Sequence, residues 1–215
     1  MPRQAAAGRA RWFFLFAWVA AVLLGVALAS RVDARAATLE KLDKSGQLQG
    51  MSERQIDDET KSAERVFEVV SVAKGVAAAP VQLGMYALAV VVLGWFARGR
   101  LRGSAVVPVA GAALLPGAVA DALDAVAAFR HAAIPPAGVP LAPRTLAAVA
   151  AALGHPLAPP VGKLGDALDF FSLWGAILLG YGVAAAAQVP RRRALVVTLV
   201  GWAGFRLLTH VGLSH

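Results

Sequence analysis

The chain of 215 residues is 58% hydrophobic and only 16% charged, with a mean hydropathy of +0.63. Soluble domains carry about 25% charged residues, so this composition predicts a membrane protein and argues against a soluble globular domain. The absence of cysteine excludes a disulfide framework, a thiol nucleophile and a thiolate metal site. A net charge of +8 would suggest nucleic acid as a partner of a soluble protein. Here the charge lies between apolar runs, so we expect no nucleic-acid partner.

The first apolar run extends from Trp12 to Ala29 and predicts a membrane span over residues 12–30. Its 18 residues would form a helix of about 27 Å, close to the thickness of the hydrocarbon core. A cleaved signal peptide is the alternative, because Ala27-Leu28-Ala29 before Ser30 fits a small-x-small cleavage site. The run is longer than the roughly 7–15 residues of a signal-peptide core, so we expect a retained anchor.

A charged segment follows, and residues 31–74 hold eight basic and nine acidic residues. Leu39 and Leu42 predict that the first helix continues past the membrane until Gly46 ends it. Ser52 and Gln55 are three residues apart and predict a capping box at the start of a second helix. We therefore expect a solvated, extracytoplasmic helical hairpin over residues 31–75.

The second and third spans are predicted over residues 78–97 and 104–129. Pro80 fits the first turn of a new helix, where its missing N–H would have no intrahelical partner. Pro108 and Pro116 lie inside the third apolar run and predict kinks there.

Residues 130–165 contain seven prolines, which exclude a continuous helix. Between these prolines, the apolar stretch from Thr145 to Leu153 would be only about 14 Å long, too short to cross a bilayer. We expect a proline-rich loop with a short interfacial helix. The fourth and fifth spans are predicted over residues 168–188 and 194–213, with Arg191–Arg193 as the turn between them.

The basic residues of the short loops predict how the chain is threaded. Three places hold nine arginines and no acidic residue: the N-terminal segment, the loop between spans two and three, and the loop between spans four and five. Short cytoplasmic loops are enriched in lysine and arginine, which places the N-terminus in the cytoplasm and the C-terminus outside. The predicted fold is all-α: a polytopic membrane protein with five transmembrane helices and an extracytoplasmic hairpin between the first and second.

One charged residue lies inside a predicted span. Arg206 in the fifth span would cost about 2.5–3.5 kcal/mol to insert, so it should face a partner. Asp121 and Asp124, near the outer end of the third span, are the nearest carboxylates in depth, and His210 shares the helix face of Arg206. These four residues could form a proton or ion site. The alternative, which we favour, is a structural ion pair that holds the third and fifth spans together.

The other polar residues do not predict catalysis. Asp166 and Asp169 are expected in the first turn of the fourth helix, where a carboxylate stabilises the helix dipole. Ser172 lacks the glycine-x-serine-x-glycine elbow, and we interpret it as an interhelical hydrogen-bonding residue on a small-residue face with Gly175 and Gly180. The spacing of the four histidines matches no metal-ligand pattern. We predict no enzymatic activity, no metal and no cofactor.

The run FFSLWGAILLGYGVAAAAQVPRRRALVV resembles the C-terminal signature of the bacterial branch of the YIP (Ypt/Rab-interacting protein) family of integral membrane proteins. That signature comprises an aspartate, Phe-Ser-x-Trp, an aliphatic run, a glycine, a short basic turn and a last hydrophobic helix. The residues that carry it here are Asp169, Phe171, Ser172, Trp174, Ile177, Leu178, Leu179, Gly180 and Arg191–Arg193. Upstream, Met51-Ser52-Glu53, Pro80 and Leu115-Pro116 fit the same pattern.

The resemblance implies a five-span protein with a cytoplasmic N-terminus in a bacterial inner membrane. Some bacterial relatives accompany transport systems as accessory subunits. Eukaryotic relatives bind small GTPases, but only eleven residues precede the first span here and the Asp-Leu-Tyr-Gly-Pro motif of those relatives is absent, so we do not expect such binding.

We therefore expect a non-enzymatic scaffold or accessory subunit of other membrane proteins. Its partners would be the lipid bilayer and other membrane proteins, including a second copy of itself. The alternative is a small transporter or proton-coupled carrier that uses Asp121, Asp124, Arg206 and His210 inside the membrane.

Overall fold

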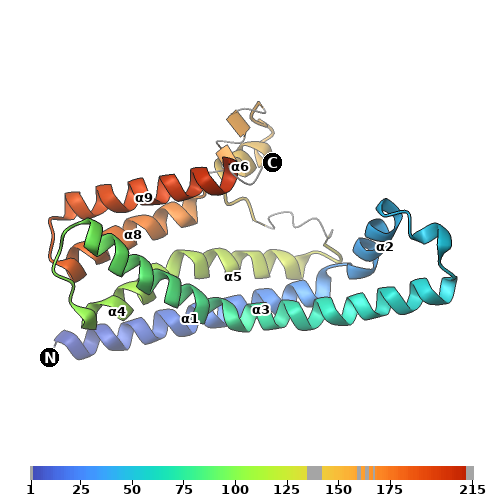
Figure 1. Cartoon of the computed structure of the whole chain (residues 1–215), viewed down its shortest axis with the longest axis horizontal. Helices are drawn as coiled ribbons and strands as arrows, with labels where there is room; N and C mark the ends of the chain where they lie inside the picture. Colours follow the sequence, from blue (N-terminus) through green and yellow to red (C-terminus); the bar gives the residue numbers. More distant parts are fainter. Residues whose placement is uncertain (1, 135–141, 159–160, 163–164, 167, 212–215) are drawn as a thin grey trace. The chain divides into compact units, whose positions relative to one another are not determined.

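The computed structural model describes the backbone of residues 2–134, 142–158, 161–162, 165–166 and 168–211. Side chains are described for the same residues except 2–10 and 210–211. Every named element of this part of the chain is a helix, as predicted, and its β-structure is limited to two isolated bridges. In chain order the elements are α1 (Pro2–Arg31), α2 (Ala34–Lys44), η1 (Leu48–Gly50), α3 (Glu53–Phe96), α4 (Gly103–Ala113), α5 (Leu115–Arg130), α6 (Leu146–Ala152), α8 (Phe170–Ala187) and α9 (Arg191–Val211) (Figure 1).

Four helical segments of the described chain are long and apolar enough to cross a membrane. They are Arg11–Arg31, Glu53–Phe96, Gly103–Arg130 and Phe170–Ala187, and they coincide with the first four predicted spans. Helix α9 is not among them. It begins with three arginines and also contains Arg206, so the fifth span stays a prediction.

Helix α3 runs without interruption from Glu53 to Phe96 and contains Pro80 in its interior. The prediction that a new helix begins near Pro80 was therefore wrong. Proline removes one backbone hydrogen bond, and the alanines that precede it are strong helix formers, so the helix continues through this position. Its 44 residues correspond to about 66 Å, roughly twice the hydrocarbon thickness. About half of α3 therefore has to lie beyond the hydrocarbon if its apolar half crosses the membrane.

The prediction that the first helix continues to Gly46 was wrong. Helix α1 ends at Arg31, and the Asp33 carboxylate caps the separate helix α2 by accepting from the Ala36 N–H at 2.8 Å.

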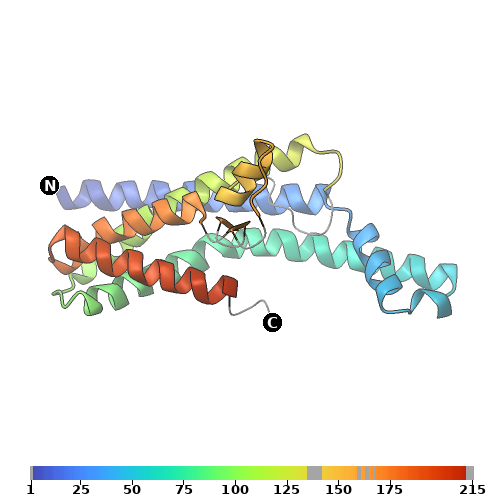
Figure 2. The ribbon, with the colours of Figure 1, turned by 90° about the horizontal axis from the view of Figure 1, so that it is seen from above.

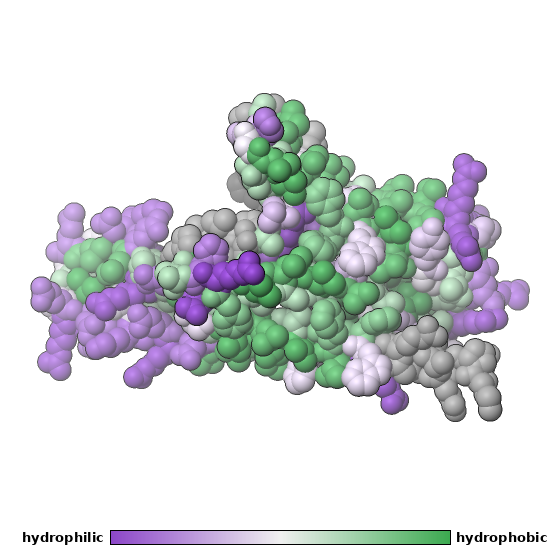
Figure 3. All heavy atoms as spheres, turned by 180° about the vertical axis from the view of Figure 1, so that it is seen from behind, coloured by the Kyte–Doolittle hydropathy of each residue, from purple (hydrophilic) through white to green (hydrophobic). Residues whose placement is uncertain are grey.

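The capping box at the start of α3 is confirmed. The Ser52 backbone N–H donates to Gln55 Oε1 at 2.9 Å, and the Gln55 N–H donates to Ser52 Oγ at 3.4 Å. One turn further on, Lys61 Nζ lies 2.6 Å from Asp57 Oδ2, and Arg35 of α2 approaches the same carboxylate at 3.8 Å. Charged side chains thus gather over α2 and the N-terminal part of α3 (Figure 3).

A second ion pair lies within α2, between Glu40 and Lys44, which are four residues apart on one face of the helix. Lys44 Nζ donates to Glu40 Oε1 at 2.6 Å. This hydrogen bond, together with the positive charge of Lys44, lowers the pKa of the Glu40 carboxyl. Both side chains are exposed, so the pair contributes little beyond local helix stability.

Residue contacts divide the chain into two compact units. The first unit comprises Met1–Trp18, Ala79–Ala120 and Pro143–His215, and the second comprises Val19–Ala78 and Asp121–Ala142. The assignment of the chain to one membrane domain stays a prediction.

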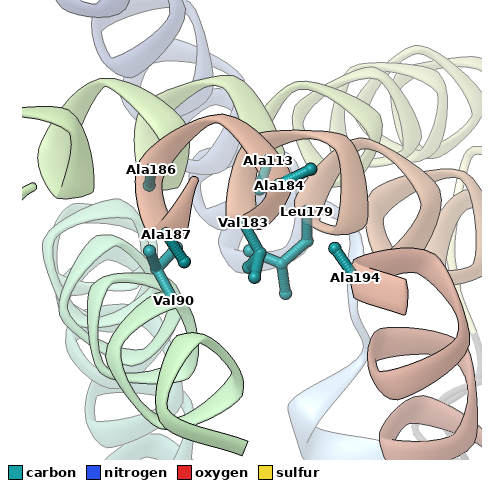
Figure 4. Close-up of a cluster of buried hydrophobic side chains, with 8 residues drawn as sticks. All are labelled: Val90, Ala113, Leu179, Val183, Ala184, Ala186, Ala187 and Ala194. Carbon is teal, nitrogen blue, oxygen red and sulfur yellow. The ribbon is translucent and has the colours of Figure 1, made fainter. Parts of the chain in front are cut away.

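Small residues form the core of the first unit, where α8 packs against α4 and α9. Helices α8 and α9 lie side by side in both ribbon views (Figures 1 and 2). Because membrane helices gain no hydrophobic energy by leaving lipid, close backbone approach at small residues is their main source of packing energy. The buried cluster consists of Val90, Ala113, Leu179, Val183, Ala184, Ala186, Ala187 and Ala194 (Figure 4).

Two glycines of α8 make these close approaches possible, toward different neighbours. A methyl group on Gly180 would lie 2.8 Å from Leu195 Cδ2 of α9, and one on Gly182 would collide with Val109 of α4. A side chain at either position would require Leu195 or Val109 to shift.

The turn between α8 and α9 differs from the prediction. Arg191–Arg193 do not form it, because α9 begins at Arg191 and includes all three arginines. The chain instead reverses at Gln188, whose left-handed backbone (φ 57°, ψ 41°) ends α8, and Pro190 precedes the first residue of α9. A left-handed residue after a helix and a proline shortly afterwards are common signals of a helix end.

The third predicted span is divided in two, as the proline pattern indicated. Helix α4 ends at Ala113 and α5 begins at Leu115, directly before Pro116. Pro116 has no N–H to donate to the carbonyl oxygen of Ala112, four residues earlier, so one helical hydrogen bond is missing where α4 ends and α5 begins. Pro108, in contrast, lies inside α4.

The proline-rich loop contains one short helix where it was expected. Helix α6 spans Leu146–Ala152, and the Thr145 hydroxyl oxygen accepts from the Ala148 N–H at 3.1 Å. An isolated bridge pairs Thr145 with Asp169, so this end of the loop is attached to the start of α8. The interfacial position of α6 stays a prediction, and Pro135, Pro136, Pro140, Pro159 and Pro160 lie outside the described residues.

Two glycines bring α1 and α3 together in the second unit. A methyl group on Gly75 would lie 2.7 Å from the Ala21 carbonyl oxygen, and one on Gly25 would lie 2.7 Å from the Ser71 carbonyl oxygen. Since both obstacles are backbone atoms, neither can rotate away. A side chain at either glycine would have to separate the two helices.

We expect Gly75→Ala to lower the stability of the protein by about 1–3 kcal/mol, the usual cost of overpacking. Gly84→Ala is the matched control in the same helix, because a methyl group there meets no described atom within 4 Å. It should be neutral or stabilise by up to about 1 kcal/mol through helix propensity. Unfolding in detergent followed by circular dichroism measures both changes. Equal changes in stability for Gly75→Ala and Gly84→Ala would contradict the close approach of α1 and α3.

Candidate functional site

The run from Asp169 to Trp174 lies at the start of α8, and Asp169 caps that helix. Its Oδ1 atom accepts hydrogen bonds from the Phe171 N–H at 2.9 Å and from the Ser172 N–H at 3.1 Å. Two backbone donors that have no partner within the helix are thereby satisfied. The capping role predicted for Asp169 is confirmed.

Ser172 connects α8 to α9. Its hydroxyl donates to the Asp169 carbonyl oxygen at 3.0 Å and accepts from Trp202 Nε1 of α9 at 3.2 Å. The interhelical hydrogen bond predicted for Ser172 is therefore present. Trp202 was not singled out in the sequence, although an indole N–H within an apolar helix requires an acceptor. That requirement is the signal by which the sequence could have identified Trp202 as a hydrogen-bonding residue.

Asp166 does not cap α8, contrary to the prediction, because it precedes the Asp169 cap by three residues. Its carboxylate Oδ1 accepts from the Thr145 hydroxyl at 3.4 Å, and its backbone carbonyl oxygen accepts from Arg206 Nη2 at 3.4 Å. Both distances are longer than the usual 2.7–3.2 Å, so each bond is weak. Together they attach the loop before α8 to α6 on one side and to α9 on the other.

The four residues of the predicted polar cluster belong to different units. Asp121 and Asp124 lie on α5 in the second unit, and Arg206 and His210 lie on α9 in the first. The Asp124 carboxylate is buried, with 8% of the residue exposed, and accepts from the Ala142 N–H at 3.0 Å. The side chain of His210 is outside the described part. A common cluster of these residues stays a prediction, whereas Asp124 already has a structural role at the loop after α5.

The other motif residues of α8 contribute to packing. Gly175 is buried, and a methyl group there would meet Tyr86 Oη at 3.6 Å, an ordinary contact. Gly180 is the more restrictive glycine because of its proximity to Leu195. Phe171 is half-buried and Trp174 is 40% exposed.

The chemistry of this network is structural. The Ser172 hydroxyl proton is directed at a carbonyl oxygen, and its other contact is an indole N–H donor. Neither group can remove a proton, so the serine is not activated as a nucleophile. Within the described residues, no group of three or more histidines and carboxylates could hold a metal ion. The arrangement fixes the start of α8 and ties it to α9.

Comparison with protein-family models, curated proteins and solved structures found no match to this chain.

The bond between Ser172 and Trp202 can be measured by a double-mutant cycle. Ser172→Ala and Trp202→Phe each remove one partner, and we expect a coupling energy of about 0.5–1.5 kcal/mol between them. Trp174→Phe combined with Ser172→Ala is the control pair, which should be additive because Trp174 makes no described hydrogen bond to Ser172. Equilibrium unfolding in detergent gives the energies. A Ser172–Trp202 cycle as additive as its control would show that the bond is not formed.

Proposed function

We propose that this chain is a non-enzymatic integral membrane protein that acts as a scaffold or accessory subunit of other membrane proteins. The observation that carries the proposal is the surface of α3. Only 11% of the most apolar window of α3 is buried within the chain, against 44% for α8. Most of this helix is therefore available to lipid or to another helix.

A regular stripe of large side chains favours another helix as the occupant of that surface. Its members follow one another at alternating spacings of four and three residues and are 41–73% exposed. We call it the α3 stripe: Val81, Met85, Leu88, Val92 and Trp95. Lipid requires only that a surface be apolar, whereas a spacing of 3.5 residues is the pattern by which two helices pack along a seam.

The opposite side of the same helix faces the chain's own core. Val90 lies there and is fully buried, and Ala89, at the edge of this core-facing surface, packs against the cluster around Val90. The stripe is therefore distinct from the surface that α3 uses inside the protein.

The threading belongs to the proposal as well. We place the N-terminus in the cytoplasm of a bacterial cell, the C-terminus outside, and five spans in the inner membrane, with α9 as the fifth. The charged segment formed by α2 and the first half of α3 would then project from the outer surface, where a partner's soluble part could reach it. The distribution of arginines supports this orientation.

We also propose membership of the YIP family. The support is that the polar residues of the motif have defined physical roles: Asp169 caps α8, Ser172 receives the Trp202 indole, and Gly180 allows α9 to approach. These roles explain why the pattern requires an aspartate, a serine and a glycine at these positions.

The chain contains no cysteine, so single cysteines can be introduced without removing a native one. We expect Met85→Cys and Trp95→Cys, each carrying a photoreactive probe, to give the same discrete protein adduct in native membranes. Val91→Cys is the exposed control beside the stripe, at 44% exposure, and Ala89→Cys is the core-facing control. Neither control should give that adduct.

Mass spectrometry of the adduct identifies the partner, and an adduct of twice the chain mass identifies a second copy. If all four positions react only with lipid, or react equally with protein, the stripe is not a helix interface and the proposed function loses its support.

A further inference from the structure

An open cavity of about 420 Å³ lies in the first unit, between the beginnings of α1 and α4 and the side of α3. Its volume falls within the range of about 300–1,000 Å³ that is usual for small-molecule sites. All of the lining residues belong to this one unit. Neither the packing of α8 and α9 nor the α3 stripe involves this cavity.

Polar and apolar lining residues follow a regular order along the two helices. On α1, Arg11 precedes Phe14, and on α4, Ser104 precedes Val107 and Pro108. Helices α1 and α4 both start at the same end of the first unit (Figures 1 and 2). A guanidinium and a hydroxyl group therefore mark one end of the cavity, and an apolar wall that includes Leu83 of α3 continues inward from it.

The polar end has the character of an anion site. Arg11 carries a permanent positive charge, and none of the lining residues is acidic. Ser104 is the second residue of α4, whose N-terminus has no side-chain cap, so the positive end of the helix dipole adds to the attraction. Arg98, Arg100 and Arg102 immediately precede this helix and reinforce the positive field.

The proline of α4 also leaves one helical hydrogen bond unmade. Pro108 has no N–H to donate to the carbonyl oxygen of Ser104, which is four residues earlier in α4. A ligand hydroxyl or ammonium group could therefore donate to this oxygen. Such a donor next to a phosphate is the chemistry of a glycerophospholipid headgroup.

We propose that this cavity binds an anionic phospholipid, with its phosphodiester held by Arg11 and Ser104 and the start of an acyl chain against Phe14, Leu83 and Val107. The occupant is a lipid rather than a free anion because the apolar wall would stay uncovered by phosphate alone. Arg11 is also the first residue of a segment long and apolar enough to span a membrane, so in a bilayer it would lie at the depth of a headgroup. The inference requires only that this unit lies in a bilayer and is independent of any protein partner of the α3 stripe.

The test is native mass spectrometry of the purified full chain in mild detergent, titrated with phosphatidylglycerol, phosphatidylcholine or inorganic phosphate. We expect saturable binding of phosphatidylglycerol and at least tenfold weaker binding of phosphatidylcholine and phosphate. Arg11→Gln should weaken phosphatidylglycerol binding roughly tenfold, the effect of one charge-assisted hydrogen bond. Val107→Trp should weaken it similarly by filling the apolar end; Val107 is 58% exposed, so the core tolerates the change.

Arg193→Gln is the matched control, since it removes the same charge from an exposed arginine that does not line the cavity. The affinity of this variant for phosphatidylglycerol should stay within about twofold of that of the original chain. An equal loss in Arg193→Gln and Arg11→Gln would show general surface attraction and overturn the proposal. If inorganic phosphate binds as tightly as phosphatidylglycerol and Val107→Trp does not weaken lipid binding, the cavity is a free-anion site and the proposal is overturned. Absence of saturable phosphatidylglycerol binding would also overturn the lipid-site proposal. That result would leave the protein adducts expected at the α3 stripe unchanged, so the two proposals can fail separately.

Discussion

Close approach of helix backbones is the constraint on which this structure depends. Hydrocarbon offers no hydrogen-bond partners, so each spanning segment satisfies its backbone as a helix, and packing between helices has to come from van der Waals contact. Gly180 and Gly182 provide it where α8 meets α9 and α4, and Gly25 and Gly75 provide it where α1 meets α3. Hydrogen bonds such as that from Trp202 to Ser172 add direction to surfaces that are otherwise uniformly apolar.

Local signals could be predicted from the sequence where their physics acts over a few residues. The Ser52–Gln55 box, the Asp169 cap and the break before Pro116 depend only on neighbouring backbone groups. The predictions at Pro80 and Asp166 were wrong for a different reason. A proline permits two outcomes, a helix start or a continued helix, and its surroundings decide between them. Likewise, Asp166 is engaged by Thr145 and Arg206, which are distant in sequence, so its role depends on tertiary structure.

The proposed function rests on the helix surfaces that are not used in packing within the chain. The cores use alanine and glycine, which places the large side chains on outer surfaces, and on α3 these form the stripe from Val81 to Trp95. The polar residues near α8 are engaged in capping and interhelical bonds rather than arranged around a reacting atom. These exposed surfaces are the basis of the proposed scaffold role, and the lipid site proposed beside Arg11 would anchor one end of the protein in the anionic leaflet.

The central claim is that the arginine clusters around Arg100 and Arg192 lie on one side of a membrane and the charged segment of α2 and α3 on the other. Single cysteines at Glu59, Arg100 and Arg192 test it most directly in intact cells with an impermeant maleimide, combined with N-terminal sequencing. The account predicts that Glu59→Cys is labelled from outside, that Arg100→Cys and Arg192→Cys are labelled only after permeabilisation, and that the N-terminal segment is retained. Labelling of all three from the same side, or cleavage after Ala29, would contradict it.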